Sequence, residues 1–175
     1  MMACLFETER LRVRPFRPED VKRTYEIHAE DAVKKWIPNE SYADLEEAEE
    51  AIRFFADCVS RGELPYVLAV ELKATGELIG DTGVNEVEGK PNEVEIGYVI
   101  SEKHSRKGYA SELVMAMTEF TVLKFGISVL YGRVMRGNEA SVRVLEKNEY
   151  TFVREEIGAE DDPYGKGMLV YKKEY

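Results

Sequence analysis

Residues 93–113, EVEIGYVISEKHSRKGYASEL, decide the fold of this chain. The first eight of them predict a strand, and residues 108–124 predict a helix whose buried face carries Leu113, Met117 and Phe120. A strand that passes through a short loop into a helix presents the free backbone N–H groups and the positive dipole end of the first helical turn. This junction therefore predicts an anion-binding site.

The loop at this junction has residues suited to binding a phosphate. Gly108 lets the backbone approach a phosphate without a clash from a Cβ atom, and the small Ala110 keeps the helix entrance open. Arg106 and Lys107 add positive charge. The G-x-x-x-x-G-K-[ST] spacing of P-loops is absent, which disfavours nucleotide hydrolysis.

The rest of the chain predicts helices first, then antiparallel strands, then alternating strands and helices. Strands are expected at residues 11–16, 66–71, 78–84, 129–136, 150–155 and 168–172. Helices are expected to begin at Pro18, Asp44 and Asn138, the second ending at Gly62 and the third near Asn148. This order predicts one α/β domain over residues 1–175, with a mixed sheet and helices on both faces.

Composition restricts the class of protein. The 175 residues carry 34 acids and 24 bases, a net charge of −10, which argues against a nucleic-acid partner. No apolar run approaches the roughly 18 residues that a membrane helix needs, and the N-terminus lacks a signal-peptide core, so we expect a cytoplasmic protein without a membrane partner. With two histidines, His28 and His104, and two distant cysteines, Cys4 and Cys58, neither a metal site nor a disulfide is expected.

Four short motifs, spread over nearly the whole chain, carry a resemblance to a known family. They are TERLRVRP (8–15), EIGY (95–98), KGYASE (107–112) and NEAS (138–141). Together they resemble the GNAT acetyltransferase superfamily, and within it the RimJ/RimL-type branch that acetylates ribosomal-protein N-termini and related amines. The resemblance implies the GNAT fold, with a mostly antiparallel twisted sheet, and transfer of acetyl from acetyl-coenzyme A to a primary amine.

The resemblance also implies which residues bind coenzyme A. The pyrophosphate loop of the family, Gln/Arg-x-x-Gly-x-Gly/Ala, corresponds to Ser105, Arg106, Lys107, Gly108, Tyr109 and Ala110. Ser105 stands where glutamine or arginine is usual, and Arg106 where glycine is common. The loop N–H groups survive both departures, so we expect cofactor binding at this loop.

Strand 93–100 is expected to hold the pantetheine arm. In the family this strand separates from its neighbour at a bulge, which frees a backbone N–H for the developing oxyanion, and Gly97 suits such a distortion. The edge that pairs with pantetheine is then Tyr98, Val99 and Ile100. Asn138 is expected both to cap a helix and to contact the cofactor.

Release of the thiol normally uses a tyrosine in this family, and Leu145 stands in its place. The Ser141 hydroxyl is a substitute within the NEAS motif, although Ser141 also fits an ordinary N3 position in a helix capped by Asn138. Glu149 and Tyr150 replace a usual Gly-Phe pair, and Asn148 is able to adopt a left-handed conformation at the helix end.

The acceptor amine must be neutral when it attacks, which requires a base. A lysine side chain with a pKa of about 10.4 costs roughly 4–5 kcal/mol to deprotonate at pH 7, against about 1 kcal/mol for an α-amine near 7.8. Glu93 and Glu95 lie on one face of the strand, and the EIGY motif favours Glu95 as the base, acting directly or through a water.

Several alternatives remain open at this point. Trp36 either contacts the substrate or only packs between the first two helices. The chain is an N-acetyltransferase, a catalytically silent coenzyme A-binding sensor, or an acyl-CoA hydrolase. Its acceptor is a protein N-terminus, a polyamine, an antibiotic or a free amino acid, and the sequence carries no signal for an oligomeric state.

Overall fold

A computed structural model describes residues 4–158 and 167–175. Within these residues the sheet has eight strands in the order β1-β2-β3-β4-β5-β6-β8-β7. The strands are β1 (Phe6–Glu7), β2 (Leu11–Arg14), β3 (Tyr66–Leu72), β4 (Leu78–Val87), β5 (Lys90–Ile100), β6 (Val129–Met135), β7 (Thr151–Glu156) and β8 (Met168–Glu174). Neighbours are antiparallel except β5 and β6, which run parallel.

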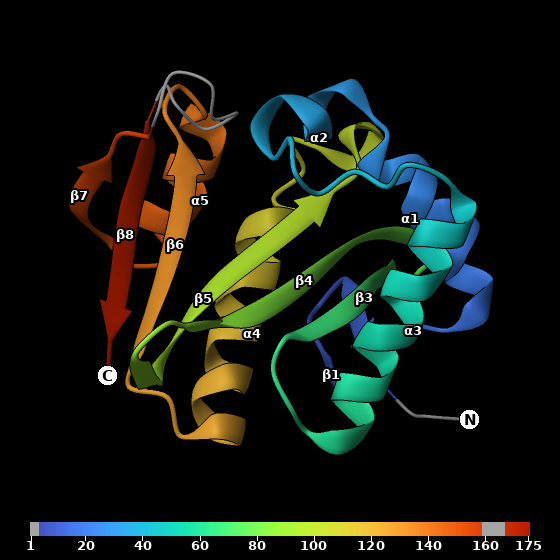
Figure 1. Ribbon diagram of the computed structural model, residues 1–175, viewed down its shortest axis with the longest axis horizontal. Helices are drawn as coiled ribbons and strands as arrows, with labels where there is room; N and C mark the ends of the chain where they lie inside the picture. The colour runs from blue at the N-terminus through green and yellow to red at the C-terminus, as the bar shows by residue number, and fades with distance from the viewer. Residues whose placement is uncertain (1–3, 159–166) are drawn as a thin grey trace.

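Helices cover both faces of the sheet. They are η1 (Pro18–Asp20), α1 (Val21–His28), α2 (Asp31–Trp36), α3 (Leu45–Arg61), η2 (Glu102–His104), α4 (Tyr109–Phe125) and α5 (Glu139–Lys147). Figure 1 shows α3 in front of β3 and β4, and α4 behind β5. The predicted mixed α/β sheet with helices on both faces is therefore confirmed.

Each long helix is fixed by local signals and by a buried stripe. The side chain of Asp44 accepts a hydrogen bond from the N–H of Glu47 at the start of α3, which ends at Gly62 with a φ of 69°. Helix α4 places Leu113 and Met117, both fully buried, against the rear face of the sheet. Burial of each such side chain stabilises the fold by about 2 kcal/mol, so packing of α4 fixes the loop before it.

Three segments differ from the sequence-based prediction. Strand β1 has two residues and α2 has six, too few for a periodic pattern to be visible. Strands β4 and β5 extend to a tight turn at Gly89, whose φ is 74°, through residues that are mostly polar. At the end of α5, Glu149 rather than Asn148 takes the left-handed conformation, with a φ of 66°.

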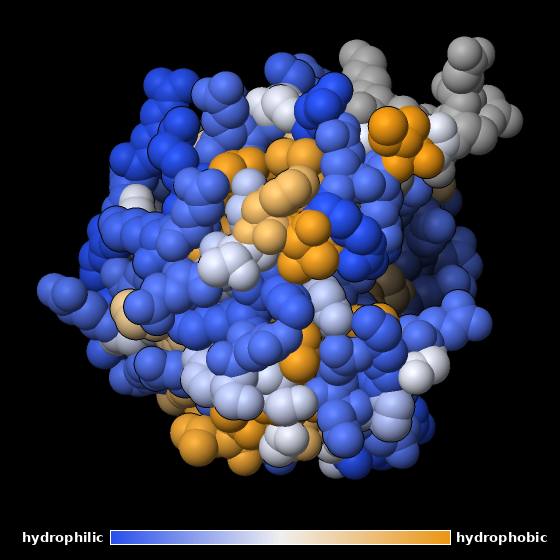
Figure 2. All heavy atoms as spheres, turned by 90° about the vertical axis from the view of Figure 1, so that its left-hand side faces the viewer, coloured by the Kyte–Doolittle hydropathy of each residue, from blue (hydrophilic) through white to orange (hydrophobic). Residues whose placement is uncertain are grey.

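The edge strand β7 is the least covered part of the sheet. Figure 2 looks onto the side that carries β7 and β8, which is mostly hydrophilic, with apolar side chains gathered above its centre and at its lower edge. On β7 the side chains of Phe152 and Val153 are exposed.

Cys58 is buried and Cys4 is partly buried, and both are free thiols. No helix in the described part of the chain has the length and apolar character to span a bilayer.

Candidate active site

A gap between β5 and β6 forms the centre of the site. The parallel pairing of these strands runs from Glu93 opposite Val129 to Ile96 opposite Gly132 and then stops. Beyond that point residues 97–100 stay paired with β4, and residues 133–135 stay paired with β8 (Figure 1). The facing backbone edges of β5 and β6 are therefore free to bind an extended ligand.

The separation does not need the bulge that was expected at Gly97. The register between β4 and β5 passes through Gly83 opposite Gly97 without a shift. The gap arises because β5 follows β4 while β6 follows β8, so the strands diverge as the sheet twists. A Cβ atom at Gly97 would meet no atom within 4 Å, so this glycine opens the gap to ligands instead of bending the strand.

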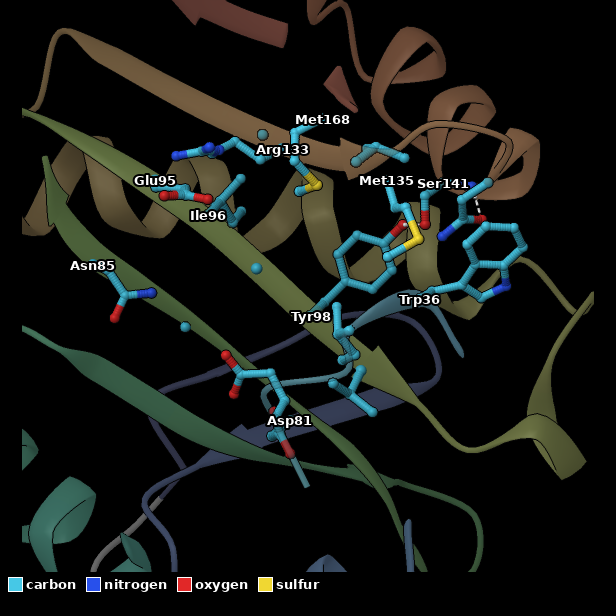
Figure 3. A pocket seen from close by; sticks show the side chains of 18 of the residues that line it. Trp36, Asp81, Asn85, Glu95, Ile96, Tyr98, Arg133, Met135, Ser141 and Met168 are labelled. Carbon is cyan, nitrogen blue, oxygen red and sulfur yellow. Dashed lines mark hydrogen bonds between the residues drawn. The ribbon is translucent and has the colours of Figure 1, made fainter. Parts of the chain in front are cut away.

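A cavity of about 640 Å³ occupies this gap and reaches both faces of the sheet. We call the part facing α1 and α2 the front half; it is lined by His28, Glu40, Tyr42, Asp81, Asn85, Glu95, Gly97 and Val99. The part facing α5 is the rear half; it is lined by Ile96, Tyr98, Asn138, Ser141 and Leu145. Figure 3 shows Tyr98 beside Ser141, with Asp81, Asn85 and Glu95 away from that pair.

In the rear half, a phenol and a hydroxyl meet. The O–H of Tyr98 donates to Oγ of Ser141 at 2.9 Å, and the backbone N–H of Ser141 donates to Oδ1 of Asn138 at 3.3 Å. Burial raises the pKa of Tyr98, and the hydrogen bond to Ser141 opposes that rise. Asn138 thus caps α5 as predicted, and Ser141 occupies N3 while its hydroxyl faces the cavity. Val99 points to the front half, away from this pair.

Leu145 explains why no tyrosine comes from α5. Its side chain packs over Gly132, where an added Cβ would lie 2.8 Å from a Leu145 methyl group. The phenol in the rear half of the cavity therefore comes from β5, through Tyr98, instead of from α5.

The loop before α4 forms a second, open part of the site. Ser105, Arg106, Lys107 and Gly108 are exposed, and Tyr109 and Ala110 are partly buried at the start of α4. Arg106 and Gly108 both have a positive φ, 61° and 82°, and no side chain caps the first turn of α4. Free N–H groups at the positive end of a helix bind anions, so the geometry fits a pyrophosphate.

Arg10 braces this loop, a role that the sequence did not reveal. Its Nη1 donates to the carbonyl of Lys107 at 2.8 Å, its Nε pairs with Glu112 at 2.9 Å, and its guanidinium lies 4.3 Å from the ring centre of Tyr109. Glu112 also accepts a hydrogen bond from the backbone N–H of Arg10. The motifs 8–15 and 107–112 are thus joined in space.

Glu95 and Glu93 lie in different surroundings. Glu95 is partly buried in the front half, where burial raises its pKa and Arg133 opposes the rise, and no described residue forms a hydrogen bond with its carboxylate. Glu93 instead accepts a hydrogen bond from the Tyr131 hydroxyl at 2.9 Å and lies 3.5 Å from the Lys90 ammonium, outside the cavity. Of these two glutamates, Glu95 alone lines the cavity.

His28, Asp81 and Glu40 form a polar cluster in the front half. His28 Nδ1 lies 2.6 Å from the carbonyl oxygen of Glu40, which only accepts, and Nε2 lies 2.6 Å from Oδ2 of Asp81. Burial disfavours the charged ring, but the charge and hydrogen bond of Asp81 outweigh it and raise the pKa of His28 to about 9. Burial and the charge of Asp81 also raise the pKa of the Glu40 carboxyl. No sequence motif marks these residues.

Trp36 lines the cavity from the end of α2 (Figure 3). Its ring lies 3.8 Å from the place where a Cβ of Gly137 would stand, next to Asn138.

His104 does not line the cavity; it is buried against Tyr109 and Glu77. Among residues 4–158 and 167–175, no group of three or more histidine, cysteine or acidic side chains is arranged to hold a metal ion.

Comparison with known proteins identifies relatives of this chain. The family model described as the Acetyltransferase (GNAT) domain matches residues 10–151. An uncharacterized N-acetyltransferase of Bacillus subtilis, YoaA, is 30% identical over 146 residues, which cover 83% of this chain and 82% of YoaA.

Solved structures share the fold at lower identity. A ribosomal-protein-S5-alanine acetyltransferase from Vibrio fischeri has a TM-score of 0.83 and 16% identity, covering 97% of this chain and 95% of its own. RimL, a ribosomal L7/L12 α-N-protein acetyltransferase solved with coenzyme A, has a TM-score of 0.81 and 16% identity, covering 98% and 97%.

Proposed function

Because the chain belongs to the GNAT acetyltransferase family, we propose that it acetylates an α-amine, at a peptide N-terminus or on a small molecule, with acetyl-coenzyme A as donor. The observation that carries this proposal is the cavity through the β5–β6 gap, which has a carboxylate in one half and a hydroxyl pair in the other. Acetyl transfer needs a proton acceptor for the amine and a proton donor for the thiolate, on opposite sides of one carbonyl carbon.

The donor side of the proposal rests on backbone groups. The uncapped first turn of α4, with Gly108 at its start, supplies N–H groups for the pyrophosphate. The free edge of residues 97–100 supplies backbone groups for the pantetheine arm and an N–H for the carbonyl oxygen. Acetyl-coenzyme A supplies an activated thioester when bound, and these groups orient it.

Glu95 is the proposed general base. As the C–N bond forms and the C–S bond breaks, the amine must lose a proton, and Glu95 is the carboxylate in the front half beside Gly97. Burial raises its pKa, which makes the carboxylate a stronger base than an exposed glutamate. Arg133 keeps the charged form accessible by opposing that rise.

Tyr98 and Ser141 are the proposed source of the proton for the leaving thiolate. The Tyr98 phenol donates to the Ser141 hydroxyl at 2.9 Å, so a proton that leaves Ser141 is replaced from Tyr98. A free thiol has an ordinary pKa of about 8.5, so its thiolate needs only modest help to leave, which a hydroxyl pair is able to give. This pair takes the place of the tyrosine that Leu145 replaces.

An α-amine is the proposed acceptor for two reasons. It needs only about one unit of deprotonation at pH 7, against more than three for a lysine side chain, and one carboxylate suffices for that. RimL and the Vibrio fischeri protein, which share this fold, are named as acetyltransferases of ribosomal proteins, RimL at an α-amine. The net charge of −10 favours a basic peptide through long-range attraction that weakens with salt.

The test is an acceptor panel with acetyl-coenzyme A, read as thiol release. Peptides with a free N-terminus are compared with N-terminally blocked peptides that contain lysine, and a sample without amine measures hydrolysis. We expect a higher kcat/KM for the free N-termini. Faster acetylation of the blocked lysine peptides contradicts the choice of acceptor. Coenzyme A binding without thiol release for any amine contradicts the proposed activity and supports a silent binding module.

A further inference from the structure

The front half of the cavity has carboxylates at both ends of an open floor. Strands β4 and β5 pair Asp81 with Val99, Gly83 with Gly97 and Asn85 with Glu95, so these side chains share one face. Asp81 and Asn85 are four residues apart on β4, so the backbone positions of the two ends lie about 13 Å from each other at about 3.3 Å per residue. Figure 3 shows Asp81 and Glu95 at separate positions along the two strands.

Two glycines, Gly83 and Gly97, lie opposite each other on the floor between these ends. An added Cβ at Gly97 would meet nothing within 4 Å, whereas one at Gly83 would lie 2.8 Å from a methyl group of Val67, so the open part of the floor is at Gly97. The walls beside the floor are apolar and comprise Ile37, Phe55, Val67 and Val99. A chain of methylene groups therefore has a place to lie between the two carboxylate ends.

The charges in the front half are unevenly matched. Asp81 is paired with the His28 imidazolium, but neither Glu40 nor Glu95 forms an ion pair within the described residues. Burial raises the pKa of both glutamates, and Asp81 raises that of Glu40 further, so a bound cation stabilises each ionised carboxylate. Among the described residues, the cationic side chains that line the cavity are His28, which is paired with Asp81, and Arg133, which is paired with Glu156 and opposes the rise in the pKa of Glu95.

We propose that the acceptor is a dication, with its reactive amine at Glu95 and a second cation held between Asp81 and Glu40. This inference rests on the proposed acetyltransferase function and names the chemistry of its acceptor. The backbone positions at the two ends are about 13 Å apart along the strands, so the two nitrogens of the acceptor must be joined by a flexible chain of several methylene groups. An N-terminal lysine, through its α-amine and ε-ammonium, meets this requirement. A diamine with a five-carbon chain meets it too but has no α-amine, so a preference for the diamine would keep the dication and overturn the choice of an α-amine.

His28 is a positioning residue in this site. Its ring holds the Glu40 backbone on one side and the Asp81 carboxylate on the other, both at 2.6 Å. It thereby joins the segment after α2 to β4 and holds Glu40 near Asp81, whose charge raises the pKa of the Glu40 carboxyl. The charge of Glu40 also raises the pKa of Glu95, so the Glu40 carboxylate is near enough to act on both acids. A free amino acid is disfavoured as acceptor, because its carboxylate would face Asp81, Glu40 and Glu95.

The experiment compares matched acceptors that differ only in the second cation. One pair is a peptide with N-terminal lysine against the same peptide with norleucine; the other is 1,5-diaminopentane against pentylamine. A partly buried charge-assisted contact is worth about a 10-fold or greater preference in kcat/KM for the dication. The two pairs distinguish a peptide source of the dication from a small diamine.

Variants locate the preference. Glu40→Gln removes a charge but keeps the backbone carbonyl that His28 contacts, and Asp81→Asn is the second variant if the first does not fold. Each is expected to reduce the ratio of kcat/KM for dication over monocation toward about 1, while Glu50→Gln, at an exposed position on α3, leaves the ratio unchanged. Equal rates for both members of each pair in the wild type overturn the dication proposal alone. Absence of thiol release with any amine overturns the proposed function instead.

Discussion

The coenzyme-binding part of the site is made of backbone, whereas the front half of the cavity is made of side chains. The first comprises the start of α4 and the free edge of β5, both within residues 93–113. The second brings His28 from α1, Glu40 from the segment after α2, Asp81 from β4 and Glu95 from β5 to one surface.

Because of this difference, the two parts of the site are expected to respond differently to substitution. A backbone site depends on dihedral angles and on the absence of a Cβ, so it tolerates many side chains and fails when its geometry or charge is altered. A side-chain site depends on the identity of each residue, so single substitutions alter its charge and its specificity. The following predictions test that contrast.

The largest effect is expected for Gly108→Asp in the phosphate loop. It adds a Cβ at a φ of 82° and a negative charge beside the first turn of α4. We expect coenzyme A affinity to fall by about 10³-fold, about 4 kcal/mol. Calorimetry on Gly76→Asp, at a φ of 75° in an exposed turn, is the matched control and should show unchanged affinity. Normal binding by a folded Gly108→Asp protein would place the pyrophosphate elsewhere.

In the front half, the His28–Asp81 pair is expected to make stability depend on pH. His28 keeps its proton to about pH 9 in the fold, whereas an unfolded histidine releases it near 6.5, so the native state binds more protons between these values. Stability is therefore complete below pH 6.5 and falls by about 3 kcal/mol as pH rises to 9.

Urea unfolding at pH 6.5, 7.5 and 9 measures this dependence. His28→Gln carries no titrating ring at that position and should lose most of it. If the wild type and His28→Gln have parallel pH profiles, the ring is not charged in the fold.

The contrast also explains how much of the molecule could be predicted from its sequence. Hydrophobic periodicity and local signals such as the Asp44 cap predicted the long helices and most strands, because these elements are determined by neighbouring residues. The two-residue β1, the six-residue α2 and the polar turn at Gly89 were missed, since their conformations depend on tertiary contacts.

For the site, the motifs identified the backbone-built part and the strand that carries Glu95. The contact of Tyr98 with Ser141 joins residues 43 apart in sequence, and only the fold brings them together. His28, Glu40 and Asp81 carry no motif, because a side-chain cluster assembled from distant segments leaves no spacing in the sequence. The brace from Arg10 to Glu112 was invisible for the same reason, although both residues lie within motifs.

Glu95→Gln tests the base in the front half and should reduce kcat by about 100-fold near neutral pH, about 2.7 kcal/mol. The amide keeps the shape of the side chain and removes its basicity, so coenzyme A affinity should barely change. Glu93→Gln is the matched control on the same face of β5, and its partners Tyr131 and Lys90 lie outside the cavity. A large loss for Glu93→Gln with none for Glu95→Gln would exchange their roles.

The smallest effect is expected at Arg106, where the backbone character of the phosphate loop is most directly tested. Arg106 has a φ of 61°, a conformation that costs a residue with a Cβ about 1 kcal/mol and glycine nothing. Glycine loses more chain entropy on folding, so Arg106→Gly should raise the free energy of unfolding by no more than about 0.5 kcal/mol. Glu149→Gly, at a φ of 66° after the end of α5, should do the same and controls for the backbone effect.

Loss of the exposed Arg106 guanidinium should lower coenzyme A affinity by no more than about threefold, a change that vanishes at high salt. Urea unfolding and calorimetry at two salt concentrations measure both quantities. A loss of affinity above about tenfold, with Glu149→Gly unaffected, would mean that the Arg106 side chain, and not the loop backbone, holds the phosphates.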